Sequence, residues 1–236
     1  MAGRKNRTQK MVQNNEVIDY YDSIADLYDK DRFDNSYGRF IDYEERRALD
    51  KLIDRSPDTL RLEMACGTGR LTQYATHALD ASEEMMKHAR ERYPDVQFRH
   101  ASADDTGFDD GMFDVVYAFH LMMHLDVPVI ENIIAEAYRI LKPGGRLIFD
   151  IPSKKRRRLL HHKQASWHGG TELTTSEVAK MAEPGFEPGR SFGIMMLPVH
   201  KLPARVRGPL KRMDYALANG WLKQYSSYLV FELVKQ

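Results

Sequence analysis

From about residue 58 onward, short apolar runs alternate with stretches of helical periodicity, and this alternation constrains the fold more than any other feature of the chain. Strands separated by helices form parallel sheets, because each helical crossover returns the chain to the same end of the sheet. The sequence therefore predicts an α/β fold. Strands are expected at 60–65 (LRLEMA), 96–100, 113–118 (FDVVYA) and 146–151 (RLIFDI).

The stretches between these runs carry helix start and stop signals. Ser82 can cap the helix that follows it, because its hydroxyl can accept a hydrogen bond from a free N–H group of the first turn. A second helix is expected to begin near Asp126, with Pro128 in its first turn, and to end at the Lys-Pro-Gly-Gly sequence of residues 142–145. Upstream, residues 39–55 have the periodicity of an amphipathic helix.

The last third of the chain has two more strand-like stretches, at 191–197 and 225–234, joined by a connection rich in proline and arginine. The cationic run KKRRR at 154–158 follows the strand predicted at 146–151. Its simplest interpretation is a solvated loop.

Composition narrows the cellular setting. The chain has 236 residues, of which 42% are hydrophobic, so it is long enough to bury a core without cross-links. One cysteine excludes an intramolecular disulfide and a zinc site built of several cysteines, which favours a reducing compartment, the cytoplasm. The first residues are basic and polar, and no apolar run approaches the length of a membrane span. We therefore expect neither a signal peptide nor a membrane-spanning segment.

A glycine-rich turn follows the first predicted strand. Gly67 and Gly69 let the backbone approach a ligand closely, at the strand end where open α/β sheets bind ligands. A dinucleotide fingerprint would need a third glycine where this chain has Thr72, so a nicotinamide or flavin site is disfavoured. Asp80 lies where a second strand would end, and its carboxylate can accept two hydrogen bonds from a ribose diol. The glycine turn and Asp80 together indicate a binding site for a nucleoside.

The glycine turn is one of several motif-like segments, which are 63–72 (EMACGTGRLT), 78–86, 107–125 and 139–149, with 20–33 upstream of them. The first four resemble, in the family's order, the successive motifs of class I S-adenosylmethionine-dependent methyltransferases, and 20–33 resembles the cap segment of many small-molecule members. The resemblance implies S-adenosylmethionine as cofactor. It also implies a Rossmann-like three-layer sandwich with a seven-stranded, mostly parallel sheet and an antiparallel β-hairpin at its edge.

The resemblance also assigns the cofactor site. It implies that Gly67 and Gly69 approach the methionine part of the cofactor, that Glu63 holds this turn and the amino group, and that Asp80 takes the ribose hydroxyls. Small and apolar residues would border the adenine and the methionine. The full set is Glu63, Ala65, Cys66, Gly67, Thr68, Gly69, Asp80, Ala81, Met85, Ser102, Ala103, Asp104, Ala118 and Phe119.

Two stretches depart from the family pattern. Residues 70–79 are short for a helix and a strand, and a helix of about two turns is expected there. Ser102 stands where members commonly have an acid that meets the adenine, and a hydroxyl accepts a hydrogen bond more weakly than a carboxylate. Asp104 is expected to compensate.

Three residues are candidates for the methyl-transfer end of the site. His124 occupies a position that faces the methyl group in related enzymes, and a histidine can accept a proton from a hydroxyl nucleophile. Tyr21 and Tyr28 could form a lid that shields the sulfonium. His120 and His124 would share a helix face and could bind a metal, but no third ligand is evident, so no metal is expected. Cys66 is expected to serve as a small residue in the turn and not as a nucleophile.

Charge is distributed unevenly along the chain. Residues 151–236 contain 15 basic residues (Lys and Arg) and 6 acidic residues (Asp and Glu). Residues 1–150 contain 20 basic and 28 acidic residues. Two basic segments, 154–163 and 201–212, favour an anionic small-molecule, lipid-linked or glycan acceptor, or peripheral contact with an anionic membrane.

Two other functions stay open: an RNA methyltransferase that grips phosphates with the basic tail, and a cofactor-binding module without catalysis. The resemblance divides the chain into an N-terminal tail and cap (1–38) and a methyltransferase domain (39–236). Residues 151–236 of that domain would complete the sheet and select the substrate.

Overall fold

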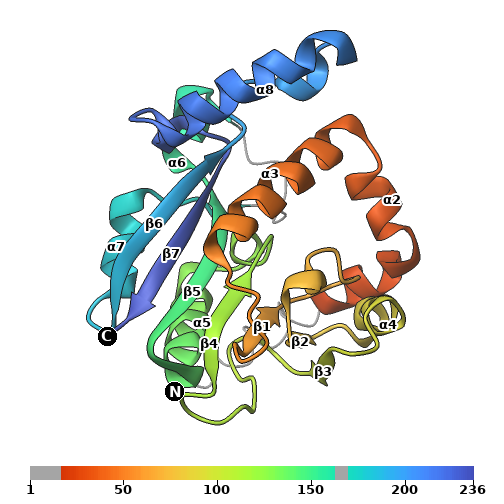
Figure 1. The fold of residues 1–236 in the computed structure, drawn as a ribbon, viewed down its shortest axis with the longest axis vertical. Helices are drawn as coiled ribbons and strands as arrows, with labels where there is room; N and C mark the ends of the chain where they lie inside the picture. The colour runs from red at the N-terminus through yellow and green to blue at the C-terminus, as the bar shows by residue number, and fades with distance from the viewer. Residues whose placement is uncertain (1–16, 163–169) are drawn as a thin grey trace, which may run out of the picture.

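The computed structural model describes residues 17–162 and 170–236. Their strands form one seven-stranded sheet in the order β3-β2-β1-β4-β5-β7-β6 (Figure 1). The first five strands pair in parallel, and the last two add an antiparallel hairpin to β5. The predicted α/β sheet with its hairpin edge is therefore confirmed. The strands are β1 (Arg61–Met64), β2 (His77–Asp80), β3 (Gln97–His100), β4 (Phe113–Ala118), β5 (Leu141–Pro152), β6 (Phe186–Ile194) and β7 (Tyr228–Lys235).

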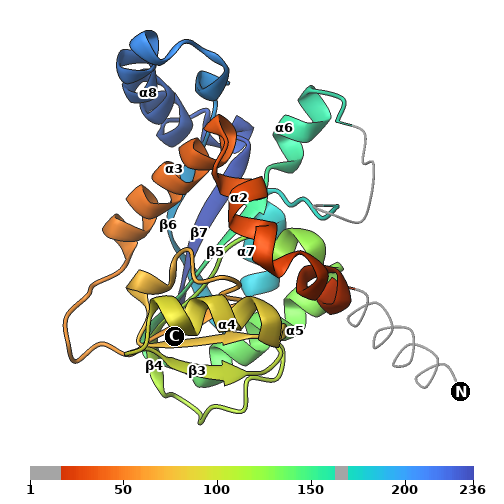
Figure 2. The same ribbon diagram turned by 90° about the vertical axis from the view of Figure 1, so that its right-hand side faces the viewer.

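Helices cover both faces of the sheet and make a three-layer arrangement (Figures 1 and 2). One face carries α3 (Ser36–Leu52), α4 (Glu83–Arg92) and α8 (Ala204–Asn219), and the other carries α5 (Val127–Ile140) and α7 (Thr175–Ala182). The central strand β4 alternates between these layers. Val116 packs against the α5 side, whereas Val115 and Tyr117 pack against the α3 side.

Local capping fixes where several helices begin. The Ser82 side chain accepts a hydrogen bond from the Met85 N–H at 3.1 Å, as the sequence predicted. Asn35 caps α3 by accepting from the N–H groups of Tyr37 and Gly38. Thr174 and Glu177 form a reciprocal capping box at α7.

Three expected connections differ from the structure. The two-turn helix expected after Arg70 is wrong: only a single 3₁₀ turn, η2 (Thr72–Tyr74), precedes β2. The helix expected to end at residues 142–145 ends at Ile140, and β5 begins directly after it at Leu141 instead of at residue 146, with an irregular pairing to β4. The run KKRRR belongs to a helix, α6 (Lys154–Leu159), capped by the Ser153 side chain.

The connection between the last two strands also contains a helix that the sequence reading missed. Proline and arginine made this stretch look irregular, but α8 runs through Pro209. Asp214 on α8 is almost fully buried and accepts a hydrogen bond from the Leu197 N–H, which ties the helix to the end of β6.

The N-terminal part of the described chain is helical from 17 to 24 and continues through η1 (Ala25–Leu27) and α2 (Tyr28–Phe33). It lies beside α4, where Ser82 donates a hydrogen bond to Asp22 and Arg92 pairs with Asp29 at 2.9 Å. These contacts hold the segment over the carboxyl ends of the parallel strands. Within the described residues, no helix combines the length and the apolar character that crossing a membrane requires.

Candidate functional site

A cavity of about 340 Å³ lies at the carboxyl ends of β1, β2 and β4, beneath the N-terminal helical segment. This volume falls within the range of pockets that hold small ligands. Most of the site residues predicted from the sequence line it. These are Tyr21, Tyr28, Ala65, Gly67, Asp80, Ala81, Met85, Ser102, Ala103, Asp104, Phe119 and His124.

The turn after β1 has a backbone shape that few residues adopt. Gly67 has φ +53°, and a Cβ added there would lie 3.3 Å from the Met85 Cε. Ala65 also has a positive φ, 55°, which is uncommon for a residue with a side chain. The backbone of this turn therefore runs close along the cavity, where a larger residue at position 67 would intrude.

Asp80 joins this turn to the end of β2. Its Oδ2 accepts a hydrogen bond from the Gly67 N–H at 2.7 Å, and its Oδ1 accepts one from the Ser82 N–H at 2.9 Å. Burial raises the pKa of the Asp80 carboxyl, and these backbone donors oppose the rise. The carboxyl group is thus fixed in orientation, with acceptor capacity left toward the cavity.

Other predicted site residues do not line the cavity. Glu63 is buried under the turn and accepts a hydrogen bond from the Thr72 hydroxyl. Burial raises the pKa of Glu63 to about 8, so it is mostly protonated at neutral pH. Cys66 packs with Ala78 and Met86, and burial raises the pKa of its thiol well above the ordinary value. Such a thiol is not activated as a nucleophile.

The remaining predicted residues support the turn from behind. Thr68 donates a hydrogen bond to Asp29 of α2, and Ala118 is fully buried in the core. Gly69 has φ +87°, and a Cβ there would lie 2.9 Å from the Ala89 Cβ of α4. Gly69 therefore permits the close packing of the turn on α4.

At the end of β3, Ser102 and Asp104 both line the cavity, and the Ser102 hydroxyl donates a hydrogen bond to Asp104. The acid thus lies directly beside the serine that replaces the family's usual carboxylate. Whether it compensates for that serine stays a prediction.

Aromatic rings close the cavity from the N-terminal segment. The Tyr21 ring packs edge-on against Tyr28, with centroids 5.9 Å apart, and against His124, with centroids 6.1 Å apart. Burial raises the pKa of both tyrosines above the ordinary value, so both are neutral. Of the three residues that the sequence singled out for the methyl-transfer end, Tyr21 therefore contacts both of the others.

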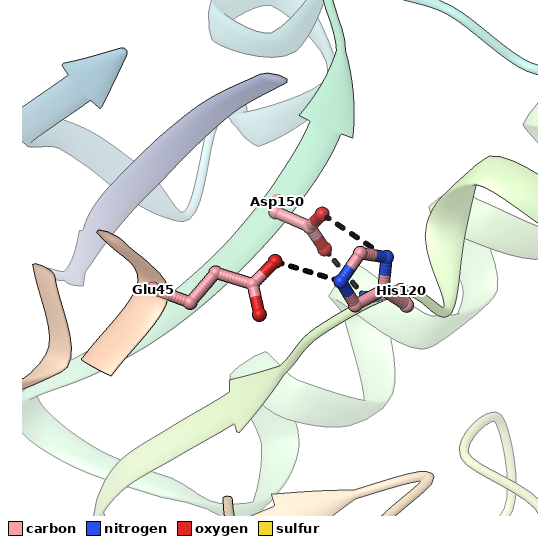
Figure 3. Close-up of side chains that lie close together, drawn as sticks. All are labelled: Glu45, His120 and Asp150. Carbon is pink, nitrogen blue, oxygen red and sulfur yellow. Dashed lines mark hydrogen bonds and ion pairs between the residues drawn. The ribbon is translucent and has the colours of Figure 1, made fainter. Parts of the chain in front are cut away.

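His120 and His124 do not share a helix face, so that interpretation of the HLMMH sequence is wrong. His120 has φ +57°, and the 3₁₀ turn η3 (Met122–His124) begins only after it. His120 instead lies against two carboxylates that the sequence reading missed, Glu45 of α3 and Asp150 of β5 (Figure 3).

Asp150 could have been found from the sequence, because it lies near the C-terminal end of β5, the strand next to β4. Glu45 carries no local signal beyond its place on an amphipathic helix, where it is fully buried.

The basic segments do not form the wall of the cavity. Among the described residues that line it there is no lysine or arginine. In α6, Arg156 donates to the carbonyl oxygens of Met196 and Tyr225, both at 2.8 Å, and Lys154 pairs with Glu177. These side chains therefore connect α6 to the C-terminal part of the chain and do not face the cavity. Lys163, part of the segment 154–163, lies outside the described residues.

Part of the chain is similar to known methyltransferases. Residues 62–149 match the family model described as a methyltransferase domain. A demethylmenaquinone methyltransferase of Renibacterium salmoninarum is 31% identical over 139 residues, covering 56% of this chain and 57% of that protein. The 27-O-demethylrifamycin SV methyltransferase of Amycolatopsis mediterranei is 30% identical over 156 residues, covering 56% and 57%. The chain thus spans little more than half the length of these relatives.

The fold extends this likeness beyond the matched segment. A crystal structure of an S-adenosylmethionine-dependent methyltransferase from Thermotoga maritima aligns with a TM-score of 0.70 at 23% identity, covering 93% of this chain and 99% of that one. Most of the fold of this chain is therefore found in another protein.

Proposed function

We propose that this chain is a class I S-adenosylmethionine-dependent methyltransferase that transfers the cofactor's methyl group to a small-molecule acceptor, as the match of residues 62–149 to a methyltransferase domain supports. The observation that carries the proposal is the cavity at the carboxyl ends of β1, β2 and β4, with Gly67 and the oriented Asp80 at one end and Tyr21 and His124 at the other. One end suits a nucleoside and the other suits a reacting group.

The residues present fit the cofactor. Asp80 keeps acceptor capacity toward the cavity for a ribose diol, and Gly67 leaves open the space that a Cβ would fill. Ala81 and Met85 offer an apolar border for the adenine. Glu63 holds the turn from behind through Thr72, so the role proposed for it is to support the turn and not to touch the amino group.

S-adenosylmethionine supplies a methyl group on a sulfonium, which is already a good leaving group. The protein therefore mainly aligns the nucleophile with the methyl carbon and excludes water. Tyr21, Tyr28 and His124 are placed to do this, because their rings pack together over the cavity. The role proposed for the N-terminal segment is that of a lid, which must open for ligands to enter.

The acceptor is proposed to be a small molecule or a lipid-linked one. The relatives named above act on small molecules according to their names, and the cavity has room for a ligand of limited size. An anionic group on the acceptor would not meet lysine or arginine in the described cavity wall, so any contact of α6 or α8 with it would lie outside the cavity.

The test is methyl transfer itself. Purified protein is incubated with S-adenosylmethionine carrying a ¹³C-labelled methyl group and a panel of phenols, alcohols, amines, quinols and lipid-linked sugars. Mass spectrometry then follows S-adenosylhomocysteine and labelled products. We expect labelled product with at least one class, and a much lower rate for Tyr21→Ala, which opens the lid. A protein that binds the cofactor but forms no product with any class would indicate a binding module instead.

A further inference from the structure

The loop after β4 holds His120 in a strained backbone conformation at the cavity wall. Its φ is +57°, and its N–H donates a hydrogen bond to the Asp150 Oδ1 at 2.6 Å. A residue with a side chain adopts a positive φ at a cost, and such residues gather at functional sites. Here the cost is offset by a short bond to a carboxylate that is almost fully buried.

The imidazole ring lies between two carboxylates, one near each ring nitrogen (Figure 3). Nε2 is 2.7 Å from the Glu45 Oε1, and Nδ1 is 4.0 Å from the Asp150 Oδ2. Both acids are buried, whereas the His120 side chain keeps 20% of its surface exposed and lines the cavity. The ring is therefore the member of this cluster that a bound molecule can reach.

Glu45 is held as an anion from its other side. Its Oε2 pairs with Arg70 at 2.6 Å, and Arg70 also pairs with Asp42 at 2.8 Å. Burial would raise the pKa of Glu45, but Arg70 and His120 lower it below the ordinary value. A charged Glu45 oxygen 2.7 Å from Nε2 favours the neutral ring that carries its proton on Nε2, because two unshared electron pairs at this distance would repel each other. In the neutral ring the free lone pair is then on Nδ1.

The surroundings also make the ring basic. Burial alone would lower the pKa of His120, but the charges of Glu45 and Asp150 raise it above the ordinary value, and Arg70 opposes them. Burial raises the pKa of Asp150 to about 6. The Tyr228 ring packs edge-on against His120 with centroids 5.8 Å apart, and burial keeps its hydroxyl neutral. The two carboxylates thus stabilise the positively charged imidazolium form of His120, in which both ring nitrogens carry a proton.

The same three side chains have atoms within 4.8 Å of one another that could bind a metal ion. The observed geometry favours a proton acceptor instead. Nε2 already pairs directly with the Glu45 Oε1 at 2.7 Å, whereas the nearest approach of Nδ1 to Asp150 is 4.0 Å, so the ring makes a direct ion pair with only one of the two carboxylates. Arg70 also already supplies a positive charge to Glu45.

We propose that His120 is the general base of the methyl transfer, with Glu45 and Asp150 as its positioning residues. The inference rests on the proposed function and narrows the acceptor to a hydroxyl or amine whose oxygen or nitrogen carries a proton. The acceptor's lone pair forms the bond to the methyl carbon, while the carbon–sulfur bond breaks and its electrons stay on sulfur. The acceptor's proton passes to Nδ1 of His120.

The proposal predicts a specific pH dependence. The base must be neutral to accept a proton, so the rate rises with pH as His120 loses its second proton. Replacing Asp150 by asparagine removes a charge that stabilises the protonated ring. The rising limb of the rate should therefore move to lower pH in Asp150→Asn, which a merely structural role of Asp150 would not produce.

Two experiments test the base. The first measures transfer to ring-substituted phenols, aliphatic alcohols and primary amines by release of S-adenosylhomocysteine. His120→Gln should lower kcat about 10²- to 10⁴-fold, with unchanged binding of S-adenosylmethionine in calorimetry. His162→Gln, at an exposed histidine outside the cavity wall, is the matched control and should keep full activity. Full activity in His120→Gln would overturn the proposal.

The second experiment needs no acceptor. ¹⁵N NMR of protein labelled at histidine should show the neutral His120 ring with its proton on Nε2, and a His120 pKa that falls in Asp150→Asn. A proton on Nδ1 in the neutral ring would overturn the proposal, as would Mn²⁺ binding in calorimetry that Asp150→Asn abolishes, since this would assign the cluster to a metal. A wild-type protein that does not bind S-adenosylmethionine in calorimetry would instead contradict the proposed function.

Discussion

The two ends of the cavity are built in different ways. The end that we assign to the cofactor comes from the turn after β1 and the end of β2, with Gly67 and Asp80 only 13 positions apart and joined by a 2.7 Å hydrogen bond. The end that we assign to the acceptor joins Glu45, His120 and Asp150, which come from α3, the loop after β4 and β5. One end depends on local backbone shape, and the other on charges brought together by the fold.

The largest effect is expected where the buried charges lose a partner. Arg70→Ala leaves Glu45, which is fully buried, without its cation. Removal of one partner of a buried pair costs about 3–5 kcal/mol. Arg55→Ala is the control, because its pair with Asp50 is roughly half exposed on both sides, and exposed pairs are worth about 0–1 kcal/mol. Urea unfolding measures both variants, and equal losses would contradict the assignment of Arg70 to a buried network.

A smaller effect is expected from packing at the cofactor end. Gly69→Ala places a Cβ 2.9 Å from the Ala89 Cβ at a φ of +87°, so both strain and collision act. Gly144→Ala is matched in backbone, with φ +74°, but meets nothing within 4 Å. We expect Gly69→Ala to lose about 1–3 kcal/mol more than the control in urea unfolding. A loss in Gly144→Ala as large as that in Gly69→Ala would show that backbone strain alone accounts for the effect.

The smallest effect is expected from proton linkage at Glu63. Its pKa is raised by burial from 4.5 to about 8, so the folded chain keeps a proton that the unfolded chain has released between these values. The folded state therefore becomes less stable as pH rises through this window, by about 1 kcal/mol for each pH unit. Glu63→Gln cannot titrate and should show a flatter dependence. Urea unfolding at pH 5, 6 and 7 gives the free energy of unfolding of both proteins. The same pH dependence in both would contradict the assignment of the retained proton to Glu63.

The contrast between the two ends also explains what the sequence could predict. The cofactor end is local: the glycine turn, the acid at the end of β2 and the Ser82 cap each depend on neighbours along the chain. The acceptor end is not local. His120 attracted attention only as a partner of His124, because the positive φ that turns it toward Glu45 has no signature in the sequence.

The connections were the least predictable part of the fold. The stretch between β1 and β2 holds a single 3₁₀ turn, in which the Tyr74 ring is buried and its hydroxyl donates a hydrogen bond to Asp50 of α3 at 2.8 Å. Pro209 made α8 look improbable, yet the helix is tied to the sheet edge by the buried Asp214. In both places tertiary packing, and not local preference, decides the structure.

The measurement that tests the account most directly is calorimetric titration of S-adenosylmethionine into the wild-type protein, Asp80→Ala and Asp95→Ala. Asp95 is an exposed carboxylate between α4 and β3 and serves as the control. We predict binding by the wild type and by Asp95→Ala, and affinity at least about 100-fold weaker in Asp80→Ala, since hydrogen bonds to a charged group contribute about 1.5–3 kcal/mol each. A folded wild-type protein that binds no S-adenosylmethionine, or undiminished binding in Asp80→Ala, would contradict the account.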